Sequence, residues 1–261
     1  MAYQHILFSQ SDGTAIITLN RPETLNAFTE TMILETTDAF KQAGQEPSVR
    51  CIVITGNGRA FSSGQDLAEV QEKSGQFSIG EHLRRGYNQL IQQMVSLEKP
   101  IIGAINGIAA GAGCGVALAT DIRIAADKAS FMLAFSKVGL VPDSGLNWLL
   151  PRIVGYARAY EMAVTAAKIP ADQALVWGMV NRVVPQAQLL ETADAWARQL
   201  AAGPTLAFGL TKRAMNHGWT MSLAETLEYE AHLQEVCGRS ADNQEGVQAF
   251  LQKRPPHFQG M

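Results

Sequence analysis

The sequence has few of the residue types and patterns that mark secreted, disulfide-rich and membrane proteins. Its only cysteines are Cys51, Cys114 and Cys237, and this odd, widely spaced set predicts no disulfide framework. No uninterrupted apolar run reaches the roughly 18 residues that a membrane-spanning helix needs. The chain does not open with a basic segment followed by an apolar one, as a secretory signal does. We therefore expect no membrane association and a cytoplasmic location.

Patterns that indicate nucleic-acid, metal or nucleotide binding are also missing. The formal net charge is −3, whereas proteins that bind nucleic acid present a basic face. The histidines are scattered, and no H-x-x-x-H or C-x-x-C motif occurs, so we expect no metal. There is no G-x-S-x-G elbow and no Gly-Lys-Ser/Thr phosphate loop. The nearest match to a dinucleotide fingerprint, G-x-G-x-x-G, fails because Val116 occupies its last glycine position.

What the sequence does contain is a large apolar fraction arranged in short, alternating segments. Of the 261 residues 47% are hydrophobic, which is enough for one large domain with a substantial core. In the first half, β-branched runs alternate with helical stretches, and this order predicts an α/β fold with parallel strands. The turn Ser11-Asp12-Gly13 predicts a hairpin within 6–19. We expect strands at 51–55, 101–105 and 122–126, and helices at 29–43, ended by Gly44, and at 81–97.

After Gly145 the pattern becomes mostly helical. We expect one strand at 179–184 and helices at 145–166, 171–177, 186–202, 205–216, 222–237 and 242–253. Gly203 followed by Pro204 predicts a boundary. We therefore divide the chain into an α/β body, 1–203, and a helical region, 204–261.

Two glycine-containing turns each follow a predicted strand: GNGRAFSSGQDL at 56–67 and NGIAAGAGCG at 106–115. Small residues let a ligand approach the backbone closely. If a helix starts near Ala112, its first N–H groups lack partners within the helix and lie at the positive end of its dipole. One such donor and one from the 56–67 turn would stabilise a developing oxyanion from two sides. The alternative is that both segments are only tight turns that pack a helix on a strand.

Asp143 is the candidate catalytic base, because acidic residues are scarce around the second glycine turn. Between residues 99 and 160 the only acids are Asp121, Asp127 and Asp143. The first two bracket a predicted strand, and we expect them at exposed strand ends. An apolar setting raises the pKa of a carboxylate and strengthens it as a base, and the sequence neighbours of Asp143 include Val141, Pro142, Leu146 and Trp148. The alternative is that Asp143 caps the helix that follows.

Other reactive side chains have simpler interpretations. Cys51 lies in an apolar run and Cys114 among glycines, so we expect both to be buried rather than nucleophilic. Glu81 and His82 open the predicted helix at 81–97. For this pair we expect a solvated helix start rather than a catalytic role.

Taken together, these motifs resemble the enoyl-CoA hydratase/isomerase (crotonase) superfamily over nearly the whole chain. The strings that carry the resemblance are LNRPETLNAF (19–28), RAFSSGQDL (59–67), KPIIGAINGIAAGAGCGVALATDIRIAAD (99–127), FSKVGLVPDSG (135–145), WGMVNRVVP (177–185) and EGVQAFLQKR (245–254). The resemblance implies a crotonase-like spiral of ββα units in 1–203 and a helical trimerisation region in 204–261. It implies a homotrimer or a dimer of trimers, with a homologous crotonase-fold subunit as a further partner.

The same resemblance implies a site and a substrate. The backbone N–H groups of Gln65 and Ala112 would be the oxyanion donors, and Asp143 the catalytic carboxylate. The substrate would be an acyl-CoA thioester, so coenzyme A is part of the substrate and no separate cofactor is implied. The residues expected to contact the substrate are Ser63, Gln65, Asp66, Leu67, Ala112 and Phe135, with Lys253 on the phosphates of coenzyme A bound to a neighbouring subunit.

Departures from the superfamily pattern favour one reaction over another. Hydratases of this superfamily use two glutamates, whose positions are taken here by Gly115 and Phe135. Because water addition needs a carboxylate pair, we expect an isomerase rather than a hydratase. Aryl-CoA dehalogenases share the aspartate at Asp143, but their tryptophan and histidine are replaced by Phe135 and Gln92.

Within the isomerases, AFSKVGLVPDSG and GRSADNQEGVQAFLQKR resemble the branch that acts on 1,2-epoxyphenylacetyl-CoA in phenylacetate degradation. A shift of a 3-enoyl to a 2-enoyl thioester is the other isomerisation that such a site would perform. Three alternatives stay open. One is an enoyl-CoA hydratase, a lyase of fatty-acid or aromatic-acid degradation. The second is an aryl-CoA hydrolase or dehalogenase, and the third is a non-catalytic acyl-CoA-binding partner subunit.

Overall fold

The chain begins with the predicted hairpin, whose turn depends on two residues that tolerate a left-handed backbone. In the computed structural model, which describes residues 3–72 and 78–261, Asp12 has φ 48° and Gly13 has φ 77°. Such a two-residue turn matches the twist of the strands that it joins. The strands β1 (Ile6–Ser11) and β2 (Thr14–Leu19) pair antiparallel, with Ile6 opposite Leu19.

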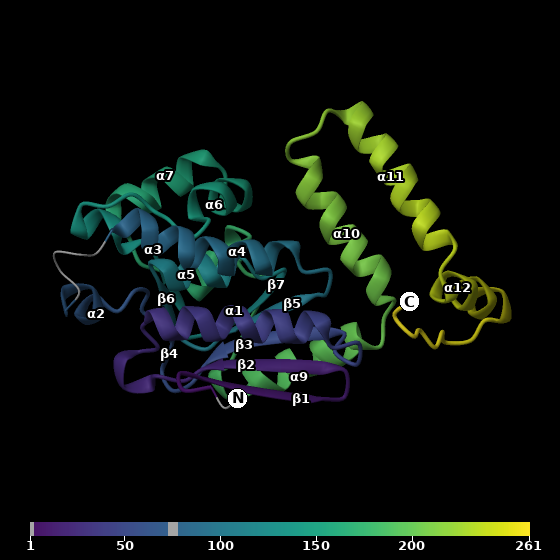
Figure 1. Cartoon of the computed structure of the whole chain (residues 1–261), viewed down its shortest axis with the longest axis horizontal. Coiled ribbons are helices and arrows are strands. Elements are labelled where there is room, and N and C mark those ends of the chain that lie inside the picture. Colours follow the sequence, from purple (N-terminus) through teal and green to yellow (C-terminus); the bar gives the residue numbers. More distant parts are fainter. Residues whose placement is uncertain (1–2, 73–77) are drawn as a thin grey trace.

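A six-stranded sheet in the order β1-β2-β3-β5-β7-β10 forms the centre of the body (Figure 1). All pairings after the hairpin are parallel, as the alternation of strands and helices predicts. The predicted central strands are confirmed, and β3 is buried along its whole length, as a strand covered on both faces should be. The bounds of the later strands are β3 (Cys51–Gly56), β5 (Ile101–Ile105), β7 (Ile122–Ala126) and β10 (Arg182–Val184).

A second, four-stranded sheet was not predicted from the sequence. Its strands are only two or three residues long, so no period-2 pattern can develop in them. Three of them follow directly on strands of the large sheet, which makes the chain rise in repeated strand-strand-helix turns and confirms the predicted spiral. The order is β4-β6-β8-β9, with bounds Ala60–Ser62, Ile108–Ala110, Ser130–Met132 and Ile169–Pro170.

The first long helix, α1 (Glu30–Gln45), begins where expected but continues past Gly44. The Thr29 side chain caps it by accepting a hydrogen bond of 3.2 Å from the N–H of Met32. At the other end, Lys99 Nζ donates to the carbonyl oxygens of Ala43 and Glu46 at 2.8 and 2.7 Å. The predicted stop at Gly44 is wrong because this distant lysine satisfies the carbonyls of the last turn.

Two predicted single helices are each broken at a glycine. The segment 81–97 forms α3 (Ile79–Arg85) and α4 (Tyr87–Ser96), with Gly86 at φ −111° and ψ −94° between them. The segment 145–166 forms α6 (Leu146–Val154) and α7 (Tyr156–Thr165), interrupted by Gly155. The predicted strand 179–184 is shortened to β10.

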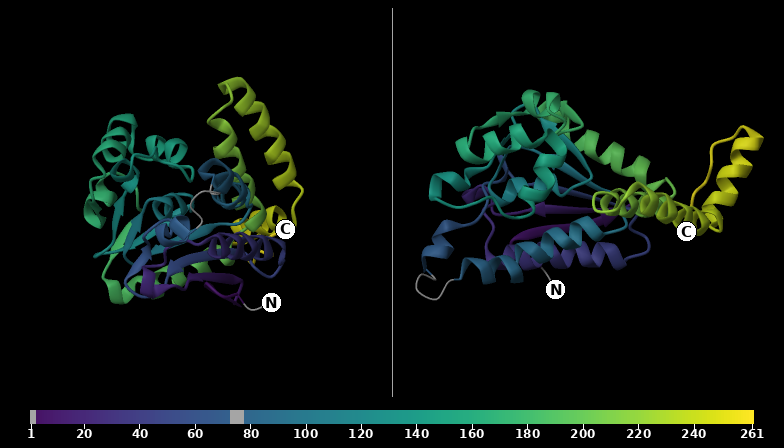
Figure 2. Two further views of the ribbon diagram at one scale, coloured as in Figure 1. Left: turned by 60° about the vertical axis from the view of Figure 1, so that its left-hand side comes forward. Right: turned by 90° about the horizontal axis from the view of Figure 1, so that it is seen from above.

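The remaining helices include one that supports the sheet and three that leave the body. Helix α9 packs against β3, β5 and β7, whereas α10, α11 and α12 project away from the body (Figures 1 and 2). Within the described ranges no helix is both long and apolar enough to span a membrane. The bounds are α2 (Leu67–Glu72), α5 (Ala112–Leu118), α8 (Ala171–Val176), α9 (Leu189–Ala201), α10 (Thr205–Gly218), α11 (Leu223–Gly238) and α12 (Ala241–Gln252), with 3₁₀ turns at Pro22–Thr24, Ala134–Val138 and Gln186–Gln188.

Helix α10 is tied to the body by a lysine. Lys212 Nζ lies 3.0 Å from Asp121 Oδ2 and donates to the carbonyl oxygen of Met94 at 2.7 Å. The Asp121 carboxylate also accepts a hydrogen bond of 2.8 Å from the N–H of Ile101. The expectation that Asp121 is an exposed strand end is therefore wrong, whereas Asp127 is exposed. The boundary at 203/204 stays a prediction, although α10 begins at Thr205, directly after Pro204.

Candidate active site

The two glycine turns predicted to hold an oxyanion lie against each other. Gly64 has φ +98°, and a Cβ placed on it would lie 2.9 Å from the carbonyl oxygen of Ala110 and 3.4 Å from the backbone nitrogen of Ala112. Both the left-handed backbone and this close approach require glycine. The contact brings Gln65, the next residue of the first turn, beside the start of the second.

The backbone around Gln65 is held in one orientation by Phe28. The N–H of Phe28 donates to the carbonyl oxygen of Gly64 at 2.7 Å, and the N–H of Asp66 donates to the carbonyl oxygen of Phe28 at 2.9 Å. Phe28 and Gln65 thus form a parallel bridge. In such a bridge the N–H of Gln65 itself points to the side away from Phe28, and it is free of this pairing.

A helix begins at Ala112, which meets the condition set in the sequence argument for the second glycine turn. Gly111 precedes it with φ 51° and ψ −127°, and Ala112 is buried. As the first residue of α5, Ala112 has an N–H with no acceptor inside the helix. This N–H lies at the positive end of the helix dipole, which favours a developing negative charge.

Helix α5 also contacts the turn that carries Asp143. A Cβ on Gly113 would lie 2.7 Å from the Cβ of Ser62, and a Cβ on Gly115 would lie 2.5 Å from the carbonyl oxygen of Ser144. Side chains at these two positions would push apart the elements that α5 separates. The helix therefore holds the first glycine turn and the Asp143 turn on either side of its own N-terminal half.

Asp143 does not cap the helix that follows it. The N-cap of α6 is Gly145, and no side chain caps this helix. The backbone carbonyl of Asp143 accepts from the N–H of Leu146 at 2.9 Å, whereas its carboxylate accepts a hydrogen bond of 2.8 Å from the hydroxyl of Ser144. The carboxylate is thus not engaged in the structural role that competed with catalysis.

The electrostatic setting of Asp143 suits a base. Burial raises the pKa of Asp143, while the Ser144 hydrogen bond and the nearby His82 act in the opposite direction. The expectation that Val141 belongs to the apolar surroundings of Asp143 is wrong, because 77% of that residue is exposed. The charge of Asp143 acts on Tyr87: burial, and then the charges of Asp143 and Glu69, raise the pKa of Tyr87 well above its ordinary value.

Two residues of the α3–α4 segment contact Gln65: Tyr87, which the sequence analysis missed, and His82, which it assigned to a solvated helix start. His82 Nε2 lies 2.9 Å from the side-chain oxygen Oε1 of Gln65, and the hydroxyl of Tyr87 donates to the same oxygen at 2.9 Å. The expected solvated helix start is wrong for His82, while Glu81 does form exposed ion pairs with Arg84 and Arg85. The sequence feature that could have indicated this contact is Gly86. It permits a break between α3 and α4, and the break directs both His82 and Tyr87 toward the Gln65 side chain.

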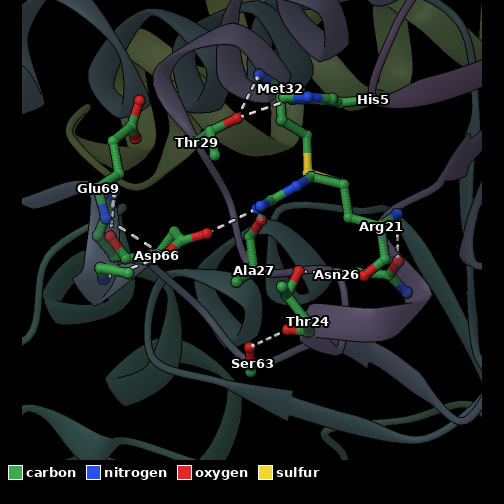
Figure 3. Close-up of polar contacts among 12 residues, drawn as sticks. His5, Arg21, Thr24, Asn26, Ala27, Thr29, Met32, Ser63, Asp66 and Glu69 are labelled. Atoms are coloured by element: carbon green, nitrogen blue, oxygen red, sulfur yellow. Dashed lines mark hydrogen bonds and ion pairs between the residues drawn. The ribbon is translucent and has the colours of Figure 1, made fainter.

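Asp66 shapes the first turn through an ion pair (Figure 3). Arg21 Nη1 lies 2.8 Å from Asp66 Oδ2 and donates to the carbonyl oxygen of Ala27 at 2.7 Å. Asp66 Oδ1 accepts from the N–H of Ala68 at 3.1 Å and so holds the start of α2. Burial alone would raise the pKa of Asp66, but these hydrogen bonds and the charge of Arg21 lower it below its ordinary value.

Replacing Arg21 tests this ion pair. Arg21→Gln is expected to lower the free energy of unfolding by about 1–3 kcal/mol at pH 7, because a largely buried carboxylate loses its charged donor. Since the pKa of Asp66 is lowered in the folded state, the difference from wild type should be complete at neutral pH and shrink below about pH 4. Urea unfolding of both proteins at pH 7 and pH 3 measures this difference in the free energy of unfolding.

The matched control is Arg239→Gln, because the Arg239–Glu235 pair has side chains that are 78% and 66% exposed. This change should alter stability by less than about 0.5 kcal/mol. An equal effect of the two substitutions, or an Arg21→Gln effect that does not depend on pH, would contradict the role given to the ion pair.

Comparison with known proteins identifies the family. Residues 9–261 match the family model described as enoyl-CoA hydratase/isomerase. The chain belongs to the enoyl-CoA hydratase/isomerase family.

The relatives agree on the family but carry names of different reactions. The chain is 44% identical to the 1,2-epoxyphenylacetyl-CoA isomerase of Escherichia coli (strain K12), over 98% of this chain and 99% of the relative. It is 46% identical to a Rhodobacter capsulatus protein named "Probable enoyl-CoA hydratase", over the full length of both. The crystal structure of an enoyl-CoA hydratase from Bacillus anthracis superimposes with a TM-score of 0.93 at 32% identity and covers 99% of this chain and 100% of that one.

Two positions of this family member exclude the carboxylate pair that the resemblance assigns to hydratases. Gly115 has no space for a side chain, as its approach to Ser144 shows. Phe135 is 8% exposed and packs toward the second turn, since a Cβ on Gly111 would lie 4.0 Å from its Cζ. Neither of these two positions carries a carboxylate, whereas Asp143 lies in the turn that α5 contacts through Gly115.

Of the remaining predicted substrate contacts, Ser63 and Leu67 lie at the first glycine turn, whereas Lys253 lies at the far end of the chain's fold. Ser63 belongs to the first turn, where its hydroxyl donates to the carbonyl oxygen of Thr24 at 3.2 Å. Leu67 is 61% exposed at the start of α2. Lys253 directly follows α12, at the end of the molecule opposite α2 and α3 (Figure 2), so one chain does not bring it to the others. Among the described residues, no group of His, Cys, Asp or Glu is arranged as a metal site.

Proposed function

We propose that this family member is an isomerase of acyl-CoA thioesters that works through a thioester enolate. One observation carries the proposal: Asp143 lies in the turn packed against α5, while Gly115 and Phe135 occupy the two positions at which the resemblance places the hydratase glutamates. A single carboxylate can remove and return a proton, whereas the hydratases that the chain resembles use two. The Escherichia coli relative is named an isomerase, which supports the proposal of an isomerase.

The proposed reaction uses backbone donors and one base. The thioester carbonyl would lie between the N–H groups of Gln65 and Ala112, and Asp143 would remove a proton from the carbon next to the carbonyl. The negative charge moves onto the thioester oxygen, where each donor contributes about 10²–10³ in rate. Asp143 then returns the proton two carbons further along the chain, which converts a 3-enoyl into a 2-enoyl thioester. A positioned general base such as this one typically raises the reaction rate by about 10²–10⁴-fold.

A ring epoxide is the other substrate that fits this chemistry. With 1,2-epoxyphenylacetyl-CoA, stabilisation of the same enolate would accompany opening of the epoxide and expansion of the ring to an oxepin. Both isomerisations leave the acyl group with the same atoms, so neither consumes water.

Comparing three substrates tests the proposal. We expect turnover of a 3-enoyl-CoA or of 1,2-epoxyphenylacetyl-CoA, and slow loss of the enoyl absorbance of crotonyl-CoA. Fast loss of that absorbance would favour a hydratase. Tight binding of acyl-CoA without turnover of any of the three would favour a non-catalytic partner subunit.

We also propose that α10–α12 form the contact of a homotrimer. These helices line an apolar groove, and several of their side chains are exposed, including Phe250 at 83% and Leu251 at 74%. In a trimer, Lys253 would reach coenzyme A bound to the neighbouring subunit. Light scattering after size exclusion should give the mass of three or six chains, and addition of a homologous subunit would reveal a mixed assembly.

A further inference from the structure

The side chain of Gln65 is held by two donors from the α3–α4 segment. Its Oε1 lies 2.9 Å from both Tyr87 Oη and His82 Nε2, while its Nε2 lies 3.4 Å from the carbonyl oxygen of Asp66. The last contact decides the orientation of the amide, because reversing it would place oxygen against oxygen. An amide oxygen only accepts hydrogen bonds, so Tyr87 and His82 are both donors and His82 carries hydrogen on Nε2.

The break at Gly86 is what allows both donors to meet. In a continuous helix, residues five positions apart point about 140° away from each other. His82 lies in the last turn of α3 and Tyr87 is the first residue of α4. A Cβ on Gly86 would lie 3.0 Å from the carbonyl oxygen of His82 and 3.4 Å from Cγ2 of Ile33, so the break is closely packed.

Tyr87 also contacts the residue that orients the Gln65 backbone. Its ring is 2% exposed and meets Phe28 edge-on at 5.9 Å and His82 edge-on at 5.6 Å. Phe28 is the partner of the two peptide groups on either side of Gln65. One buried tyrosine therefore supports both the side chain and the backbone of the residue that supplies an oxyanion donor.

We propose that Tyr87 and His82 are positioning residues, which hold Gln65 so that its backbone N–H faces the thioester oxygen. This inference rests on the part of the proposed function in which Gln65 and Ala112 bind the thioester carbonyl, and it does not depend on which reaction follows. Misplacement of a catalytic donor by a fraction of an ångström weakens its effect on the transition state more than its effect on binding.

The test measures polarisation of the bound carbonyl. In an Asp143→Asn background, which prevents turnover, crotonyl-CoA labelled with ¹³C at the thioester carbonyl is bound and its infrared C=O frequency is recorded. We expect Asp143→Asn alone to lower the frequency relative to free crotonyl-CoA, and Tyr87→Phe, which keeps the ring but removes the donor, to reduce that shift. His82→Phe should also reduce it, whereas His82→Gln, which retains an N–H donor, should restore most of it.

In the otherwise wild-type enzyme, Tyr87→Phe should lower kcat by about 2- to 12-fold, the range of one net hydrogen bond, with KM nearly unchanged. Tyr160→Phe is the matched control, because Tyr160 is 58% exposed on α7, and it should change neither quantity. An unaltered carbonyl frequency in Tyr87→Phe, or loss of thioester binding in that variant, would overturn the inference. A chain that isomerises no substrate yet shows the expected frequencies would reject the isomerase function and retain the positioning role.

Discussion

Asp143→Asn is expected to lower the rate of isomerisation by about 10²-fold or more, the scale of a lost general base. Asparagine has nearly the same shape but cannot accept the proton from the substrate. Because Asp143 belongs to the turn between the 3₁₀ turn Ala134–Val138 and α6, and its side chain caps no helix, the variant should fold and bind acyl-CoA. Initial rates and calorimetric binding measure the two properties separately.

The pKa of Asp143 gives this prediction a second readout. Burial raises that pKa in the folded protein, so the ionised form lowers stability as pH rises through the folded-state value. Asparagine does not ionise, and the variant should unfold at the same or a higher temperature at pH 7. For wild type, kcat/KM should fall on the acid side at a pH above about 3.9, the ordinary aspartate value.

Asp127→Asn is the matched control, because Asp127 is exposed and lies outside the site. It should leave the rate unchanged. Retention of most isomerase activity in Asp143→Asn would remove Asp143 from the mechanism, and a collapse of its melting temperature would show that the carboxylate is structural.

Gly115→Ala is expected to be the second most damaging change. Alanine usually stabilises a helix relative to glycine, but here its Cβ would lie 2.5 Å from the carbonyl oxygen of Ser144 and 2.7 Å from the Ser144 Cβ. Because the first of these is a backbone atom, the Asp143 turn must move. We expect a loss of about 1–3 kcal/mol in stability and of about 10²-fold in kcat, since a displacement of 1 Å has that effect on a positioned group.

The same contact predicts that the hydratase glutamate cannot be restored by one substitution. Gly115→Glu should unfold at a lower temperature and hydrate crotonyl-CoA no faster than wild type. Gly238→Ala is the control, because Gly238 also lies in a helix and a Cβ there would meet no atom within 4 Å. Faster hydration by Gly115→Glu than by wild type would show that the Asp143 turn adapts and that glycine is not a barrier to the second carboxylate.

Much of the fold follows from local sequence signals. The hairpin at Asp12 and Gly13 and the buried strand β3 were predicted from turn residues and β-branched runs. The helix start that the oxyanion argument assumed near Ala112 is also present. The errors occur where a distant residue changes a local preference. Lys99 satisfies the end of α1 beyond Gly44, and Lys212 pairs with Asp121 at what had been interpreted as an exposed strand end.

The sequence by itself determined the α/β class, because turns and strands depend on neighbouring residues, and its scarcity of acids pointed to Asp143. The resemblance of its motifs to the superfamily implied the family and the donors Gln65 and Ala112. Only the tertiary structure decided that the two glycine turns touch at Gly64, that Gly115 has no space for a side chain, and that His82 and Tyr87 hold Gln65. These are contacts between segments far apart in the chain, and they exist only after the strands and helices have packed together.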